Sequence, residues 1–169
     1  MEKQRQLVAW TENGQIHMIP SLVQQMAQPF LERIAELESL RPFHYKEQPH
    51  YLIALSRAYE ALGLYYERVG HIREAFDAYV AAALAVTEVD DYWWCDCDEG
   101  FVLSQPFRGR FFTVYGQCRK LLYKHPCLRD TTAYESLMHD FIRLTKVSER
   151  WHDEFIEAIE TVRAWSFQR

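Results

Sequence analysis

The chain has 169 residues, of which 49% are hydrophobic and 15% aromatic. This composition excludes intrinsic disorder as the main state, and only six glycines and six prolines argue against a sandwich or barrel of many short strands. The formal net charge of −5 is opposite in sign to that of general nucleic-acid binders. The sequence therefore predicts one globular domain over residues 1–169.

The start of the chain shows no signal-peptide pattern, because residues 1–6 are charged and polar and no apolar segment of the required length follows. No apolar run reaches the roughly 18 residues that a membrane helix needs. We therefore expect a cytoplasmic protein without a membrane partner. Its cysteines are then expected as reduced thiols, at Cys95, Cys97, Cys118 and Cys127.

Residues 1–20 contain one hairpin signal, Asn13-Gly14, between two β-prone segments. Asn-Gly suits a type I′ turn, because both central residues of that turn have positive φ. The alternative for residues 1–20 is an extended arm without strand pairing. If the hairpin forms, the predicted cross-strand pairs are Thr11 with Ile16 and Ala9 with Met18.

From Ser21 onward, apolar residues recur at steps of three and four, which predicts an amphipathic helix. Pro29 should kink this helix or mark its start, because proline lacks a backbone N–H. Arg41-Pro42 should end it. The residues expected on its buried face are Val23, Met26, Phe30, Ile34, Leu37 and Leu40.

The same periodicity predicts five further helices. Three of them span about residues 49–68, 72–86 and 106–125. A fourth begins near Thr132, which should form a capping box with Glu135, and a fifth begins near Ser148. The expected fold class is all-α, with about six helices joined as antiparallel helical hairpins. The apolar stripe of the helix at 106–125 is Phe107, Phe111, Val114, Cys118, Leu121 and His125.

The second and third predicted helices carry aromatic and small residues at fixed spacing. Gly63 and Ala75 are small where the two helices should cross, and Gly70 suits the tight turn between them. Over residues 56–89 the pattern resembles one tetratricopeptide repeat, with Thr87 in place of the usual proline. The residues that carry the resemblance are Tyr59, Leu62, Gly63, Tyr66, Gly70, Ala75, Tyr79 and Ala82.

This resemblance implies a right-handed array of helical hairpins, in which the first helix of each repeat lines a concave groove for a protein or peptide. Arg57 or Arg68 would then hold a carboxylate of the partner. The alternative is a solvated helix face of mixed charge. Mapped position by position, the partner-binding residues are Arg57, Glu60, Leu64, Glu67 and Arg68.

Charges are segregated in the middle of the chain. Residues 74–107 hold eight acidic residues and no Lys or Arg, whereas residues 100–129 hold six Lys and Arg and no acidic residue. Residues 88–105 lack a helical period and are expected to form an acidic loop between helices. Trp93 and Trp94 of this loop should pack against the start of the next helix or contact another chain. The cations expected opposite the loop are Arg108, Arg110 and Arg119.

Catalytic signatures are missing from the sequence, which has no Gly-rich phosphate loop, H-E-x-x-H or G-x-S-x-G. We therefore expect neither an enzyme nor a bound cofactor. Two short motifs, Cys95-x-Cys97 and His125-x-Cys127, supply four zinc-type ligands. Their one-residue spacers are unusual for zinc, so buried or free thiols are the main expectation.

The sequence predicts a protein-interaction adaptor or scaffold that binds another protein or peptide without catalysis. One alternative is a small metal- or redox-sensing protein that uses Cys95, Cys97, His125 and Cys127. The other is a structural subunit that associates with itself, for example as a homodimer. Neither nucleic acid nor a membrane is expected as a partner.

Overall fold

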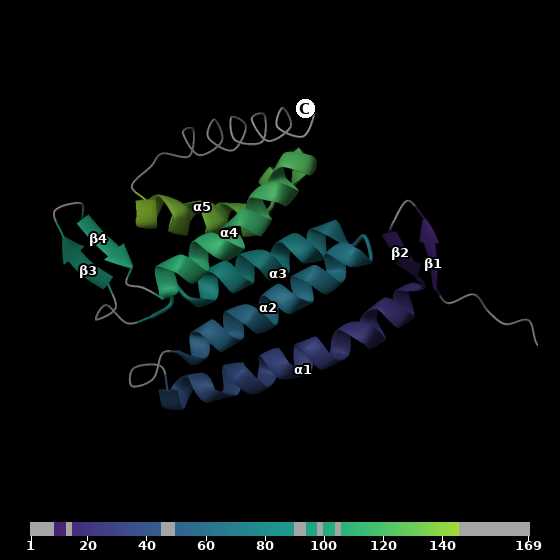
Figure 1. The fold of residues 1–169 in the computed structure, drawn as a ribbon, viewed down its shortest axis with the longest axis horizontal. Coiled ribbons are helices and arrows are strands. Elements are labelled where there is room, and N and C mark those ends of the chain that lie inside the picture. Colours follow the sequence, from purple (N-terminus) through teal and green to yellow (C-terminus); the bar gives the residue numbers. More distant parts are fainter. Residues whose placement is uncertain are drawn as a thin grey trace, which may run out of the picture.

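Helices dominate the computed structural model, which describes residues 9–12, 15–44, 50–89, 94–97, 100–103 and 106–145. Figure 1 shows α1, α2 and α3 side by side in chain order, and α4 and α5 both pack on α3. The expected helical class is confirmed, and the helix expected from Ser148 lies outside the described residues. The described helices are α1 (Pro20–His44), α2 (Tyr51–Arg68), α3 (Ile72–Ala85), α4 (Phe107–Lys124), the 3-10 helix η2 (Pro126–Asp130) and α5 (Thr132–Thr145).

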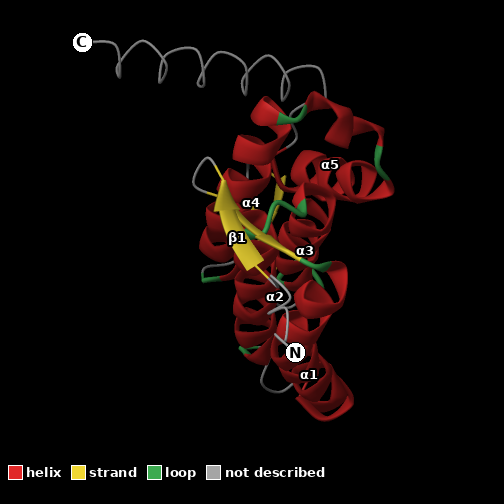
Figure 2. Cartoon of the chain, turned by 90° about the vertical axis from the view of Figure 1, so that its right-hand side faces the viewer, coloured by secondary structure: helices red, strands yellow, loops and turns green. Residues whose placement is uncertain are grey.

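The first of two small hairpins pairs β1 (Ala9–Glu12) with β2 (Gln15–Met18) in antiparallel fashion. It lies at the end of the helical stack where α1 begins (Figures 1 and 2). The register places Thr11 opposite Ile16 and Ala9 opposite Met18. This is the register predicted from Asn13-Gly14, because a two-residue turn fixes which residues face each other.

The second hairpin pairs β3 (Trp94–Cys97) with β4 (Gly100–Leu103). The prediction that residues 88–105 form only a loop is therefore wrong for these eight residues. Trp94 pairs with Leu103 and Asp96 with Phe101. Aromatic and β-branched residues favour extended pairing when a short turn brings them together. The absence of a helical period in this segment excluded a helix, but it could not distinguish a loop from a hairpin.

The helix α1 continues unbroken through Pro29 to His44. Pro29 therefore does not mark its start, and Arg41-Pro42 does not end it. Proline costs the helix one backbone hydrogen bond, but burial of the same helix face on both sides of Pro29 outweighs this loss. The buried residues of this face are Val23, Ala27, Ile34 and Leu37. Met26 and Leu40, which were expected on this face, are instead 49% and 38% exposed, since the helical period places both beyond the same margin of the buried face.

The helices α2 and α3 share the most extensive contact of any helix pair in the described fold. The turn between them uses Gly70 at φ 80°, a conformation that favours glycine. A Cβ atom on Gly63 would lie only 2.6 Å from two ring carbons of the fully buried Tyr79. Ala75 and Ala82 on α3 are also fully buried, so small residues allow the backbones to approach as expected.

The helix α4 buries its predicted stripe from Phe107 to Leu121, and the Tyr115 ring stacks on Phe141 of α5 at 4.8 Å between centroids. The cap of α5 differs from the prediction. The Thr131 hydroxyl, not that of Thr132, accepts a hydrogen bond from the Tyr134 backbone N–H at 3.2 Å, because η2 places Thr131 in extended conformation just before the helix. No described helix combines the length and apolar composition that a membrane crossing requires.

Candidate functional site

One side of α2 has no helix packed on it in the part of the chain that the structure describes. Arg57, Ala61, Leu64 and Arg68 follow at steps of four, three and four, so they share this side. Arg57 and Arg68 are exposed, and Leu64 is 41% exposed. We call these four residues the outer face of α2. Three of the five predicted partner-binding residues of the repeat lie on it.

Glu60, the fourth predicted partner-binding residue, is not available to a partner. Its carboxylate lies 2.5 Å from the Arg110 guanidinium of α4, and the two side chains are only 19% and 12% exposed. Arg110 also donates through Nε to the hydroxyl of the buried Ser56, at 2.9 Å. Glu60 therefore holds α4 against α2. Arg110 was expected to face the acidic segment, whose side chains lie outside the described residues.

Glu67, the fifth predicted residue, is likewise used inside the protein. Its carboxylate accepts a hydrogen bond of 2.7 Å from the Tyr79 hydroxyl of α3. Burial, followed by this bond to an anion, raises the pKa of Tyr79 well above its usual range. The Tyr79 phenol therefore stays protonated and donates its hydrogen bond to the Glu67 carboxylate, close to the crossing of α2 and α3.

The outer face of α2 is therefore positive, not of mixed charge. The only acidic residues of α2 are Glu60 and Glu67, and both are held by internal partners. Arg57 and Arg68 remain exposed. The sequence could not show this difference, because the partners of the two glutamates come from other helices.

The side of α2 next to α1 is closed by two tyrosines. The Tyr65 hydroxyl donates to the Val23 carbonyl oxygen at 2.7 Å, and its ring stacks on Phe30. The Tyr59 hydroxyl donates to Glu38 at 2.6 Å, and burial together with Glu38 raises the pKa of Tyr59. These contacts fix α1 as one border of the outer face.

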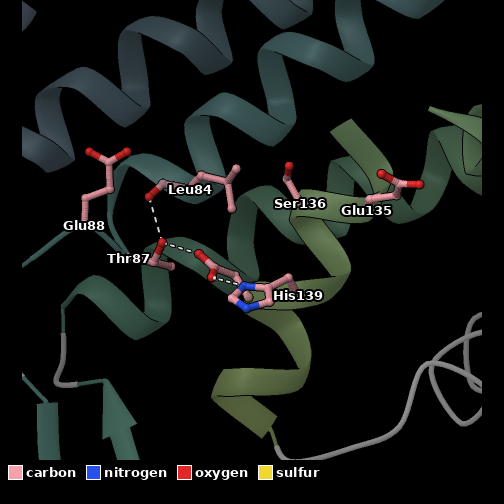
Figure 3. Close-up of a pocket in the computed structure, with 7 residues that line it drawn as sticks. Leu84, Thr87, Glu88, Glu135, Ser136 and His139 are labelled. Carbon is pink, nitrogen blue, oxygen red and sulfur yellow. Dashed lines mark hydrogen bonds and ion pairs between the residues drawn. The ribbon is translucent and has the colours of Figure 1, made fainter. Parts of the chain in front are cut away.

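A hollow, which the sequence did not indicate, lies between the end of α3 and α5 (Figure 3). Its volume is about 510 Å³. The Thr87 hydroxyl contacts both the Leu84 carbonyl oxygen and the carboxylate of the buried Asp140. Arg143 pairs with Asp140 and donates to the Thr87 carbonyl oxygen. Thr87 departs from the repeat pattern, and this departure was the one signal of the contact.

The hollow does not assemble a catalytic triad, although Ser136, His139 and Asp140 all line it. The His139 ring lies 3.3 Å from Asp140 and its side chain is mostly exposed. The described hydrogen bonds include none between Ser136 and His139, and Figure 3 shows these two side chains pointing in different directions. A nucleophile and a base must lie within hydrogen-bonding reach of each other, so we assign no chemistry to this hollow.

The four zinc-type ligands considered from sequence are not brought together. Cys95 and Cys97 belong to β3, which lies at the end of the stack where α4 begins, whereas His125 and Cys127 follow the end of α4 (Figure 1). An 18-residue helix spans about 27 Å between the two pairs. Among the described residues, no three His, Cys, Asp or Glu side chains form a group that could hold a metal ion.

The remaining predicted contact residues are Trp93 and Trp94. Trp93 lies outside the described residues, and only the backbone of Trp94 is described, as the first residue of β3. The packing of their rings therefore stays a prediction. Of the other two cysteines, Cys118 is fully buried, which raises the pKa of its thiol, and Cys127 is exposed.

Comparison of the chain with protein-family models, with curated proteins and with solved structures finds no match in any of the three.

Proposed function

We propose that this protein is an interaction module that binds another protein chain on the outer face of α2. The observation that supports this most strongly is the combination of Arg57, Leu64 and Arg68 on one exposed helix side. An exposed apolar residue between two arginines suits a partner with apolar and acidic groups. No catalytic or metal-binding arrangement among the described residues competes with this use.

The resemblance to a tetratricopeptide repeat belongs to the same proposal. In its favour, the small and aromatic positions of the pattern meet at the α2–α3 crossing, where Gly63 packs on Tyr79. In such an array the first helix of the repeat binds the partner, and here that helix is α2. The right-handed array, the adaptor role and the cytoplasmic location are parts of this proposal.

Photo-crosslinking tests the proposal directly. A benzophenone amino acid at position 64 should crosslink a protein in cells of the source organism, because it sits on the proposed contact face. The same amino acid at position 35, an exposed alanine of α1, is the matched control and should give no such product. Equal products from both positions, or none from position 64, would contradict a binding role for this face.

A further inference from the structure

We infer that the partner presents an acidic segment, and that the surface which receives it extends from α2 onto α4. This inference rests on the proposed function and specifies the chemistry of its partner. We call the combined surface the basic face. It comprises Arg57, Leu64 and Arg68 of α2, and Lys120 and Lys124 of α4.

The charge of these two helices differs from that of the whole protein. The helices α2 and α4 together hold seven lysines and arginines and only two glutamates, whereas the whole chain carries a formal net charge of −5. Both glutamates are held inside, Glu60 by Arg110 and Glu67 by Tyr79. No carboxylate of these helices is therefore left to neutralise the basic face.

The start of α4 packs against α2, and the two helices run in the same direction. The ring of His50, just before α2, stacks on Phe107 at the start of α4. Arg110, less than one turn into α4, meets Glu60, which lies between two and three turns into α2. Beyond Arg110, the residues on the same side of α4 follow at steps of three and four. This series leads from the contact with α2 to two exposed cations, through Thr113, Gln117, Lys120 and Lys124.

The spacing of the exposed arginines on α2 indicates how the acidic groups of the partner should be spaced. Arg57 and Arg68 are eleven residues apart, or about 16 Å along the helix. Between them lie only Ala61 and the exposed Leu64 on this side. An amphipathic segment with acidic residues about 16 Å apart and apolar residues between them complements this pattern.

A protein segment fits this surface better than a nucleic acid does. A nucleic acid carries regular phosphates and would leave Leu64 without an apolar contact. The acidic balance of the rest of the chain would also repel a long polyanion, whereas a short acidic segment meets mainly the local positive charge.

The test uses three fluorescein-labelled, alanine-based helical peptides of about 16 residues. The first has glutamates eleven positions apart with two leucines between them on the same side. The second and third replace the glutamates by glutamine and by lysine. We expect only the glutamate peptide to bind in fluorescence anisotropy, with an affinity that falls as salt is raised.

Charge-reversed variants locate the binding. Arg57→Glu with Arg68→Glu, and separately Lys120→Glu with Lys124→Glu, should each weaken binding of the glutamate peptide at least tenfold. Arg73→Glu, at an exposed arginine of α3, is the matched control and should bind as the unchanged protein does. Circular dichroism and thermal melting verify that each variant is folded.

Three results would overturn the inference: equal binding of all three peptides, no binding of the glutamate peptide, or full binding by both double variants. Displacement of the peptide by an equal concentration of a single-stranded oligonucleotide would assign the basic face to nucleic acid instead. The crosslink at position 64 separates this inference from the proposed function. If the crosslink persists in the charge-reversed variants, the binding role of the outer face of α2 stands, and the acidic character of the partner is refuted.

Discussion

At the scale of single residues, the contact of Gly63 with Tyr79 gives the sharpest prediction. Gly63→Ala should lower the free energy of unfolding by about 1–3 kcal/mol, because the new methyl group would meet the ring at 2.6 Å and the buried ring has no open space to move into. Urea denaturation followed by circular dichroism measures this change.

Gly116 on α4 is the matched control, because no heavy atom lies within 4 Å of the Cβ position there. Gly116→Ala should raise stability by about 0.5–1 kcal/mol, since alanine restricts the unfolded chain more than glycine does. If Gly63→Ala is as stable as the unchanged protein, the close crossing of α2 and α3 is not correct.

The thiols of Cys118 and Cys127 should react at very different rates. Burial raises the pKa of Cys118, so its reactive thiolate is scarce as well as shielded, whereas Cys127 is exposed. Iodoacetamide labelling of the native protein, read by peptide mass spectrometry, should modify Cys127 promptly. Cys118 should be modified only in urea, and rapid native labelling of Cys118 would contradict its placement in the core.

At the scale of elements, the start of α5 distinguishes two neighbouring threonines. Thr131→Ala should cost about 1 kcal/mol, because it removes the hydroxyl that accepts the Tyr134 N–H and donates to the Leu128 carbonyl oxygen. Thr132→Ala should stay within about 0.5 kcal/mol of the unchanged protein. Thermal melting measures the stability lost in each variant. A larger loss in Thr132→Ala than in Thr131→Ala would show that Thr132 is the cap.

Helix boundaries were the least predictable feature of the elements. The apolar period located α2 and α4 well, because most of their buried residues lie on one repeating side. The expectation that a helix ends at the residue before a proline placed the end of α1 too early, at Arg41-Pro42. A proline penalises the local backbone, but at Pro29 the burial of α1 residues on both sides outweighs that cost.

At the scale of the whole molecule, Thr87 connects the end of α3 to α5. Thr87→Val should cost about 1–3 kcal/mol, since the variant keeps the shape but leaves the buried Asp140 without the hydroxyl. Hydrogen exchange should also become faster in the amides of α5, because this contact holds α5 to α3.

Thr113→Val is the control for this experiment. The Thr113 hydroxyl donates only within its own helix, to the Gly109 carbonyl oxygen at 2.9 Å on the exposed side of α4. Its removal should leave α5 exchange unchanged. If hydrogen exchange in α5 is as slow in Thr87→Val as in the unchanged protein, other contacts, such as that of Tyr115 with Phe141, are sufficient to hold α5 in place.

Features that depend only on neighbouring residues could be predicted from the sequence. The helical period, the glycine turn at Gly70 and the hairpin register at Asn13-Gly14 all follow from dihedral preferences and side-chain spacing within a few residues. Which charged groups of α2 stay exposed depends on the tertiary structure. Glu60 and Glu67 have the same local pattern as exposed glutamates, but Arg110 and Tyr79 reach them from other helices. A charge is free or neutralised according to what the fold places beside it, and those partners lie up to fifty residues away along the chain.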